Sequence, residues 1–151
     1  MELDNFFLAE YDPKNIDHKT VIIKLENADR KDKHLGDLEY HIEKINKRRE
    51  YNRCNHAYIS YYDDIPIGFI SIYTENDSYQ ISYGIIPERR QEYLEALLLQ
   101  EFSEKMYEVY PEIDNLTLTI KPNNEASRKL ANLVGFERQN TVKYTQRRMW
   151  V

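Results

Sequence analysis

Hydrophobic positions in the first third of the chain follow two different spacings. The segment 20–26 (Thr-Val-Ile-Ile-Lys-Leu-Glu) is rich in β-branched residues, which predicts a strand. Over residues 35–45 the apolar side chains recur every three or four positions, which predicts an amphipathic helix ending in the charged run 47–50. Such a charged run is typical of a solvated helix end.

The middle of the chain changes to strand-like alternation and then back to a helical period. Segments 56–62, 67–73 and 79–86 predict three strands joined by short polar turns, and therefore an antiparallel meander. Apolar side chains then fall on one helical stripe from Arg90 to about Tyr110, and Pro111 follows where the helix should end.

The last third alternates again. Residues 115–121 predict a strand, Asn123 or Asn124 an N-cap for a helix that runs to Val134, and Gly135 a C-cap. The tail, 136–151, predicts one or two further strands with Val142, Tyr144 and Met149 on one face. The predicted order is β-α-β-β-β-α-β-α-β(-β), which requires a parallel strand pair with a right-handed crossover inside a mixed sheet.

Composition limits the function classes. The 151 residues suit one domain, 1–151, and 41% hydrophobic with 31% charged residues indicate a folded protein. No apolar run approaches the roughly 18 residues that span a bilayer, and the acidic first residues lack the features of a secretory signal. A single cysteine, Cys54, excludes an intramolecular disulfide. We therefore expect a cytoplasmic protein without a membrane segment.

The tyrosines, histidines and cysteine give little support for other classes of function. The net charge of -5 argues against nucleic-acid binding, so tyrosines in the predicted strands are expected to form strands or to line an acceptor groove. The four histidines show no metal-ligand spacing, so no metal is expected. Cys54 is expected to be an idle thiol, because a nucleophile would need a site that stabilises the thiolate.

Two motifs stand in the predicted order of elements. Gly-Ile-Ile-Pro-Glu-Arg-Arg (84–90) leads into the long helix, and Asn-Glu-Ala-Ser (124–127) opens the next helix, which is followed by Val-Gly-Phe (134–136). Together with the element order they resemble the GNAT acyltransferase superfamily over about residues 57–144. The resemblance implies an α/β fold: a mixed, mostly antiparallel sheet of six or seven strands flanked by helices, with a β-α-β-α C-terminal half.

The first motif departs from the family at the cofactor loop. Members usually have Arg or Gln followed by Gly-x-Gly and a further small residue, where backbone N–H groups of the helix start receive the pyrophosphate of coenzyme A. Arg90 matches, but Gln91, Tyr93 and Glu95 replace the small positions. The resemblance implies cofactor contacts at Arg89, Arg90, Gln91 and Tyr93. Alternatively, both arginines pair with neighbouring acids on a solvated helix start.

The resemblance also implies where an acetyl group would react. Backbone groups of Ile85 and Ile86 would bind the pantetheine arm and point a donor at the acetyl carbonyl, and Asn124 would contact the cofactor. The tyrosine acid that many members place seven residues after the motif Asn is absent, because Ala131 stands there. Ser127 and Tyr144 are the remaining catalytic candidates, and Ser127 has an alternative role at the helix start.

The activity implied is acetyl-CoA-dependent N-acetyl transfer to a primary amine of a small molecule or a protein, with acetyl-CoA as cosubstrate. The alternative is a GNAT-fold binding or interaction module that is catalytically weak or inactive because the altered loop has lost tight coenzyme A binding. Edge strands in the tail allow either a monomer or a homodimer.

Overall fold

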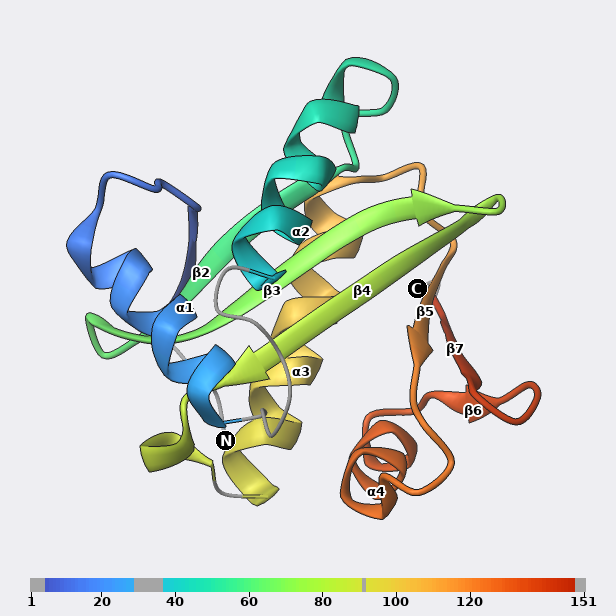
Figure 1. The fold of residues 1–151 in the computed structure, drawn as a ribbon. Helices are drawn as coiled ribbons and strands as arrows, with labels where there is room; N and C mark the ends of the chain where they lie inside the picture. Colours follow the sequence, from blue (N-terminus) through green and yellow to red (C-terminus); the bar gives the residue numbers. More distant parts are fainter. Residues whose placement is uncertain (1–4, 29–36, 91, 149–151) are drawn as a thin grey trace.

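The computed structural model describes residues 5–28, 37–90 and 92–148, in which seven strands form one sheet in the order β1-β2-β3-β4-β5-β7-β6 (Figure 1). The strands are β1 Phe6–Glu10, β2 His56–Tyr62, β3 Ile65–Glu75, β4 Ser78–Ile85, β5 Asn115–Thr119, β6 Glu137–Arg138 and β7 Lys143–Arg147. The helices are α1 Ile16–Ala28, α2 Asp37–Lys47, α3 Glu92–Val109 and α4 Glu125–Leu133, with 3-10 turns η1 Arg48–Glu50 and η2 Pro87–Arg89. The β4–β5 pair is parallel and the others are antiparallel, so the predicted mixed sheet is confirmed.

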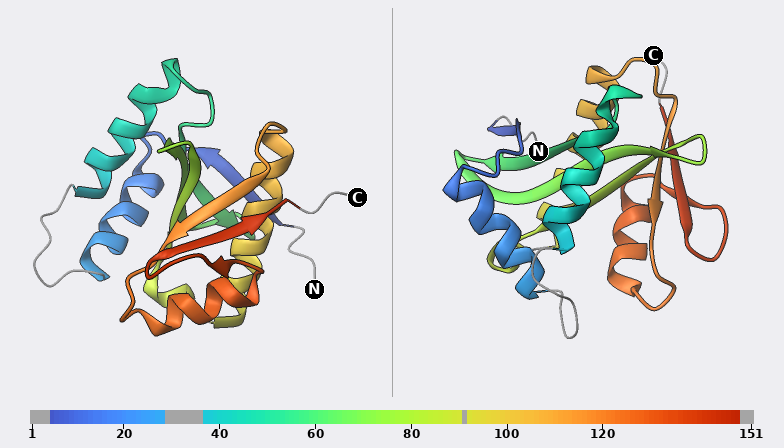
Figure 2. Two further views of the ribbon diagram at one scale, coloured as in Figure 1. Left: turned by 90° about the vertical axis from the view of Figure 1, so that its right-hand side faces the viewer. Right: turned by 45° about the horizontal axis from the view of Figure 1, so that its top comes forward.

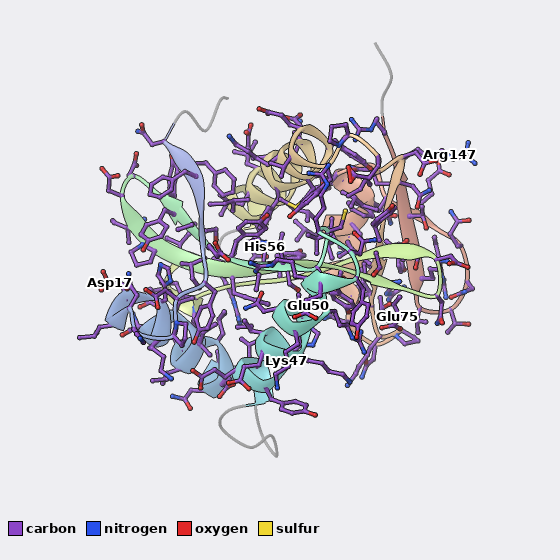
Figure 3. The ribbon with its side chains drawn as sticks, turned by 90° about the horizontal axis from the view of Figure 1, so that it is seen from above. Asp17, Lys47, Glu50, His56, Glu75 and Arg147 are labelled. Atoms are coloured by element: carbon purple, nitrogen blue, oxygen red, sulfur yellow. The ribbon has the colours of Figure 1, made fainter. Side chains whose placement is uncertain are left out.

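Helices cover the two faces of the sheet separately. Helices α1 and α2 lie on one face of β1–β4, and α3 lies on the other (Figures 1 and 2). The view from above shows Asp17 on α1 and Lys47 at the end of α2 on the same side of the sheet, with Arg147 of β7 at the far end (Figure 3). Helix α4 shares the core cluster of α3, β5 and β7.

The predicted meander is confirmed, and its turns explain its register. Asp63 and Asp64 between β2 and β3, and Asn76 and Asp77 between β3 and β4, all have positive φ. Two central residues with positive φ match the right-handed twist of antiparallel strands, and Asn and Asp tolerate this conformation best among non-glycine residues. The turns set the pairing at the two ends of β3, and an irregularity at Ser60 and Tyr61 shifts the β2–β3 register by one residue.

The predicted strand over 20–26 is wrong, because these residues belong to α1. The Asn15 side chain accepts hydrogen bonds from the N–H groups of Asp17 and His18, which starts the helix. The buried side chains of α1 share one helical face: His18, Val21, Ile22 and Leu25. The first strand of the sheet is instead β1, an edge strand that the sequence pattern did not indicate.

The C-terminal half follows the prediction closely. Asn124 caps α4, with its Oδ1 accepting the Ser127 N–H at 3.1 Å. The helix ends in a Schellman motif, in which the Phe136 N–H donates to the Ala131 carbonyl and the Gly135 N–H to the Asn132 carbonyl. Gly135 has a φ of 89°, as a C-cap glycine should.

Some smaller parts of the prediction are wrong, and others concern residues outside the described ranges. Of the three residues predicted on one strand face, Tyr144 is buried, Val142 is exposed, and Met149 lies outside the described residues. The first residues of the predicted helix over 35–45 also lie outside them. No helix within residues 5–28, 37–90 and 92–148 is long and apolar enough to cross a membrane.

Candidate functional site

Strands β4 and β5 share a single pair of bridged residues in the sheet. The backbone pairing of this parallel pair is at Gln80 and Thr117, although β4 continues to Ile85 and β5 to Thr119. The two strands part after this bridge, in the direction in which both chains run (Figure 1). The C-terminal half of β4 is therefore paired on its β3 side and not on its β5 side.

The register of β4 on β3 decides which backbone groups face the open side. The Ile86 N–H donates to the Ile67 carbonyl at 2.8 Å, and Ile85 lies opposite Gly68. Successive residues of a strand direct their N–H and C=O groups to opposite edges. The N–H and C=O of Ile85 therefore point toward the β5 side.

Ile86, the other predicted backbone contact, is used differently. Its N–H is taken by Ile67, and its carbonyl accepts the Arg89 N–H at 2.9 Å. Both polar groups of Ile86 are thus engaged within the chain, whereas Ile85 directs both of its groups to the open edge. β4 pairs with β3 without interruption from Ser78 to Ile85. It therefore separates from β5 without a β-bulge in its pairing with β3.

A short turn brings the predicted arginines back toward the end of β4. In η2 the Arg90 N–H donates to the Pro87 carbonyl at 3.2 Å. The Arg90 Nε then donates to the Ile85 carbonyl at 2.7 Å. Arg89 is half-buried and Arg90 is exposed. The arginine that matches the family motif therefore contacts the open edge of β4.

The acid nearest to these arginines in sequence has its own partner. Glu88 Oε2 lies 2.8 Å from Lys24 Nζ of α1, and this ion pair lowers the pKa of the Glu88 carboxyl. Arg90 Nε contacts the Ile85 carbonyl, and the alternative in which both arginines pair with neighbouring acids stays a prediction. Gln91 lies outside the described residues, as does the side chain of Tyr93, whose backbone belongs to α3.

The second motif lies at the N-terminus of α4, which follows β5. Asn124 is exposed, and its Oδ1 accepts a hydrogen bond from the Ser127 N–H. Ser127 is half-buried, one turn into the helix. The cap role of Asn124 is confirmed, and the catalytic role of Ser127 stays a prediction.

Tyr144 lies in a different environment from Ser127. It is 2% exposed and belongs to the core cluster of α3, α4 and β5, opposite Leu118. The ring therefore packs as a core residue. For a role in catalysis, its hydroxyl would have to reach the reacting sulfur from within this core. That role also stays a prediction.

A cross-strand row of polar side chains marks the place where β4 and β5 part. Tyr73 lies opposite Gln80, Gln80 bridges to Thr117, and Thr117 lies opposite Thr145. The neighbours of Thr117 in β5, Leu116 and Leu118, pack into the α3 and α4 core, so the row faces the α1 and α2 side. The Thr117 hydroxyl is buried with no hydrogen-bond partner among the described residues.

Helix α2 places a histidine against this row. The rings of His41 and Tyr73 meet edge to face with centroids 5.3 Å apart. Burial lowers the pKa of His41, the cations Lys44 and Arg48 add to this effect, and Glu75 opposes it. His41 is therefore neutral near pH 7. Its spacing from Leu38 and Ile45 on the buried side of the helix is the signal that could have placed it here.

Cys54 and the histidines support no second site. Cys54 is fully buried, and burial together with Glu112 raises the pKa of its thiol to about 11, so the thiolate is disfavoured. Within the described ranges there is no group of three or more His, Cys, Asp or Glu side chains that could hold a metal ion.

Several solved structures with a similar fold are acetyltransferases. The aminoglycoside acetyltransferase AAC(6')-Ib in complex with paromomycin and acetyl-CoA matches with a TM-score of 0.67 and 16% identity, over 96% of this chain and 94% of that one. The ribosomal-protein-S5-alanine acetyltransferase from Vibrio fischeri matches with a TM-score of 0.71 and 10% identity, over 97% and 95%. RimL, the ribosomal L7/L12 alpha-N-protein acetyltransferase, matches with a TM-score of 0.70 and 14% identity, over 95% and 91%.

A coenzyme A complex of the aminoglycoside enzyme also matches, with a TM-score of 0.54 and 19% identity, over 62% of this chain and 66% of that one. No protein-family model matches the sequence, and no curated protein does. At identities of 10% to 19%, the comparison establishes a shared fold.

Proposed function

We propose that this chain, which has the fold of the GNAT acetyltransferases, transfers an acetyl group from acetyl-CoA to a primary amine. The observation that carries the proposal is the open edge of β4, where Ile85 directs its N–H and C=O toward β5 and β5 does not pair with it. An extended pantetheine arm has alternating amide donors and acceptors, and it can bind such an edge as an additional strand would.

The two motifs would hold the rest of the coenzyme. Arg89 and Arg90 lie next to this edge and supply positive charge for the pyrophosphate. Gln91 and Tyr93 stand at the start of α3, whose N-terminal N–H groups favour anions. Asn124 would contact the coenzyme from the start of α4. Lys24 adds positive charge on α1 and offsets Glu88.

The reaction follows from the chemistry of a thioester. The neutral amine attacks the acetyl carbonyl carbon, a C–N bond forms, the C–S bond breaks, and coenzyme A leaves as a thiolate. The Ile85 N–H would stabilise the oxyanion of the tetrahedral intermediate. The amine loses one proton to a base, and the sulfur gains one. Ser127 and Tyr144 are the candidates for donating to the sulfur.

The acceptor would approach from the side of the polar row. His41 lies against Tyr73, which pairs with Gln80, five residues or roughly 17 Å before Ile85 along β4, so we assign it the proton of the attacking amine through bridging water. The row Tyr73, Gln80, Thr117 and Thr145 offers hydroxyl and amide groups for the acceptor. The acceptor is a primary amine of a small molecule or of a protein, and substrate screening distinguishes the two.

Calorimetric titration of the purified chain with acetyl-CoA tests the proposal. We expect saturable binding, followed by release of free thiol when a panel of polyamines, aminoglycosides and N-terminal peptides is added. Omitting the amine controls for thioester hydrolysis. Absence of binding at millimolar acetyl-CoA would contradict the enzyme and favour the alternative, an interaction module that has lost coenzyme A binding.

A further inference from the structure

We infer that Asn55 is a positioning residue for the proposed reaction, because its side chain links the end of α2 to β3 and thereby holds His41 against Tyr73. The inference rests on the proposed function, in which His41 takes the proton of the attacking amine. Asn55 is buried, so it acts through His41 and not on the reacting atoms.

The side-chain amide of Asn55 bonds a helix end to a strand. Asn55 lies between η1 and β2 and is 2% exposed. Its Nδ2 donates to the Arg48 carbonyl at 2.8 Å, just after α2 ends. Its Oδ1 accepts the Thr74 N–H at 2.9 Å and the Thr74 hydroxyl at 3.2 Å. Both ends of this buried amide are therefore satisfied, by two elements that are distant in the sequence.

The two residues that Asn55 joins are placed next to the contact of His41. Thr74 directly follows Tyr73 in β3, and the rings of His41 and Tyr73 meet with centroids 5.3 Å apart. Arg48 follows His41 by seven residues, which is about two helical turns along the same face. A displacement of the end of α2 away from β3 would therefore break the bonds of Asn55 and open the contact between the two rings.

Arg49 supports this link through the backbone of Asn55. Its Nε donates to the Asn55 carbonyl at 3.3 Å, and its Nη2 donates to Asn46 Oδ1 of α2 at 2.8 Å. Its Nη1 donates to Glu10 Oε1 of β1 at 2.7 Å. The pair with Glu10 is partly exposed, and such pairs contribute little to stability. The buried bonds of Asn55 carry more of the constraint, because cutting them leaves buried polar groups without partners.

The apolar contacts of α2 do not replace these hydrogen bonds. Helix α2 packs on β2 and β3, with Ile42 and Ile45 buried beneath it (Figure 1). Apolar burial is non-directional, so it holds the helix on the sheet without fixing its rotation about its own axis. Hydrogen bonds are directional. Asn55 therefore fixes how the face of α2 that carries His41 is turned toward the polar row.

The groups around His41 determine what a loss of this constraint does. Burial lowers the pKa of His41 most, and the cations Lys44 and Arg48 lower it further. From β3, Glu75 opposes the shift and Tyr73 presents its ring. If the end of α2 moves off the sheet, water reaches the imidazole and the effect of burial decreases. The pKa of His41 should then rise toward its ordinary value near 6.5.

The test follows the His41 ring directly, without requiring activity. NMR titration of the ring protons gives the pKa of His41 in the wild type, Asn55→Ala, Asn55→Ser and Tyr58→Phe, and His41→Gln assigns the resonance by its loss. A serine side chain is too short to bond both partners of Asn55. Tyr58→Phe is the matched control, because it loses a buried hydrogen bond of 2.8 Å to Tyr110 on the α3 side of the sheet. Thermal unfolding verifies that each variant folds, and Asn55→Ser decides the test if Asn55→Ala does not fold.

We expect both Asn55 variants to raise the pKa of His41 by about 0.5 or more. Their kcat should fall about tenfold because the base is misplaced, with the KM for acetyl-CoA unchanged. The acidic limb of their pH profile should move to higher pH together with the pKa of His41. Tyr58→Phe should keep the wild-type pKa and the wild-type limb.

An unchanged pKa of His41 in the folded Asn55 variants overturns the inference and leaves the proposed function standing. A lower kcat with an unmoved acidic limb also overturns it, since the role of Asn55 would then be purely structural. If the wild type transfers no acetyl group to any amine, the proposed function fails and the role of Asn55 in the reaction fails with it. The titration still decides in that case whether Asn55 holds His41 in place.

Discussion

Nδ1 of His18 accepts a hydrogen bond of 3.0 Å from the backbone N–H of Asp12. Nε2 of the same ring lies 3.0 Å from the Tyr61 hydroxyl. The ring is buried between α1 and β2, and accepting an N–H at Nδ1 requires that this nitrogen carry no proton. The folded chain therefore holds His18 in its neutral form.

This contact predicts a loss of stability in mild acid. Burial lowers the pKa of His18 below its usual value near 6.5, although Asp12 and Asp17 oppose the shift. Below that value the unfolded chain binds a proton that the folded chain does not, so the free energy of unfolding falls as the pH falls. We expect the melting temperature of the wild type to drop more steeply between pH 7 and pH 5 than that of His18→Asn. His41 and His56 contribute equally to both proteins, and equal slopes would contradict the prediction.

The wrong prediction for residues 20–26 has a physical origin close to His18. Val21, Ile22 and Ile23 favour strands intrinsically, but Val21 and Leu25 are four residues apart and both face the core. The cap at Asn15, two residues before Asp17, was the local signal for a helix. The burial of one helical face in the core outweighed the strand preference of these β-branched residues. Tertiary packing often overrides such local preferences.

The central hairpins were predictable because two signals agreed. Runs of β-branched and aromatic residues in β2–β4 coincided with Asp-Asp and Asn-Asp pairs that adopt positive φ. The second motif was predictable for the same reason, since Asn124 and Gly135 satisfy local cap geometry. The contact from Arg90 to Ile85 was not, because it depends on the register of β4 on β3.

Asn124 gives a prediction that separates its cap role from its proposed cofactor contact. Asn124→Ala should lower the free energy of unfolding by about 1 kcal/mol, because the Ser127 N–H loses its acceptor. Asn124→Asp keeps an acceptor and adds favourable charge at the helix start, so stability should be retained. The added charge should weaken acetyl-CoA binding if the pyrophosphate lies nearby. Urea unfolding and calorimetry measure the two effects, and unchanged affinity in Asn124→Asp would remove Asn124 from the cofactor site.

The glycines predict a ranking of stabilities. An added Cβ at Gly68 would lie 2.4 Å from the Gly84 carbonyl oxygen, so Gly68→Ala should cost about 2–3 kcal/mol. Gly135→Ala meets no atom within 4 Å but strains a φ of +89°, which should cost about 1–2 kcal/mol. Gly84→Ala meets only the flexible Leu25 side chain at 3.1 Å and should cost least. Urea unfolding of the three variants gives the order, and a different order would contradict this account of the sheet.

Ser127 and Tyr144 differ in their access to the leaving sulfur. Ser127 is half-buried at the start of α4, whereas Tyr144 is 2% exposed in the core. We expect Ser127→Ala to lower kcat about tenfold or more with acetyl-CoA held saturating, since a placed proton donor contributes roughly 100-fold or more. Tyr144→Phe keeps the packed ring and should leave kcat within about twofold. Steady-state kinetics distinguish the two, and a reversed result would assign the donor role to Tyr144.

His41 gives the prediction that bears most directly on catalysis. The base must be neutral to take the amine proton, and burial, Lys44 and Arg48 lower the pKa of His41 while Glu75 opposes them. The kcat of the wild type should therefore fall with decreasing pH through a value below 6.5. His41→Gln should lower kcat by about 100-fold and abolish this acidic limb, with the KM for acetyl-CoA unchanged.

His56 supplies the control for His41. Burial lowers its pKa as well, but its ring stacks on Tyr58 of β2, away from the contact with Tyr73. His56→Gln should keep both kcat and the acidic limb of the pH profile. If His41→Gln keeps the limb, another group takes the amine proton. If both variants lose activity in parallel with their melting temperatures, the effect of His41 is structural, because a catalytic base changes the pH profile without destabilising the fold.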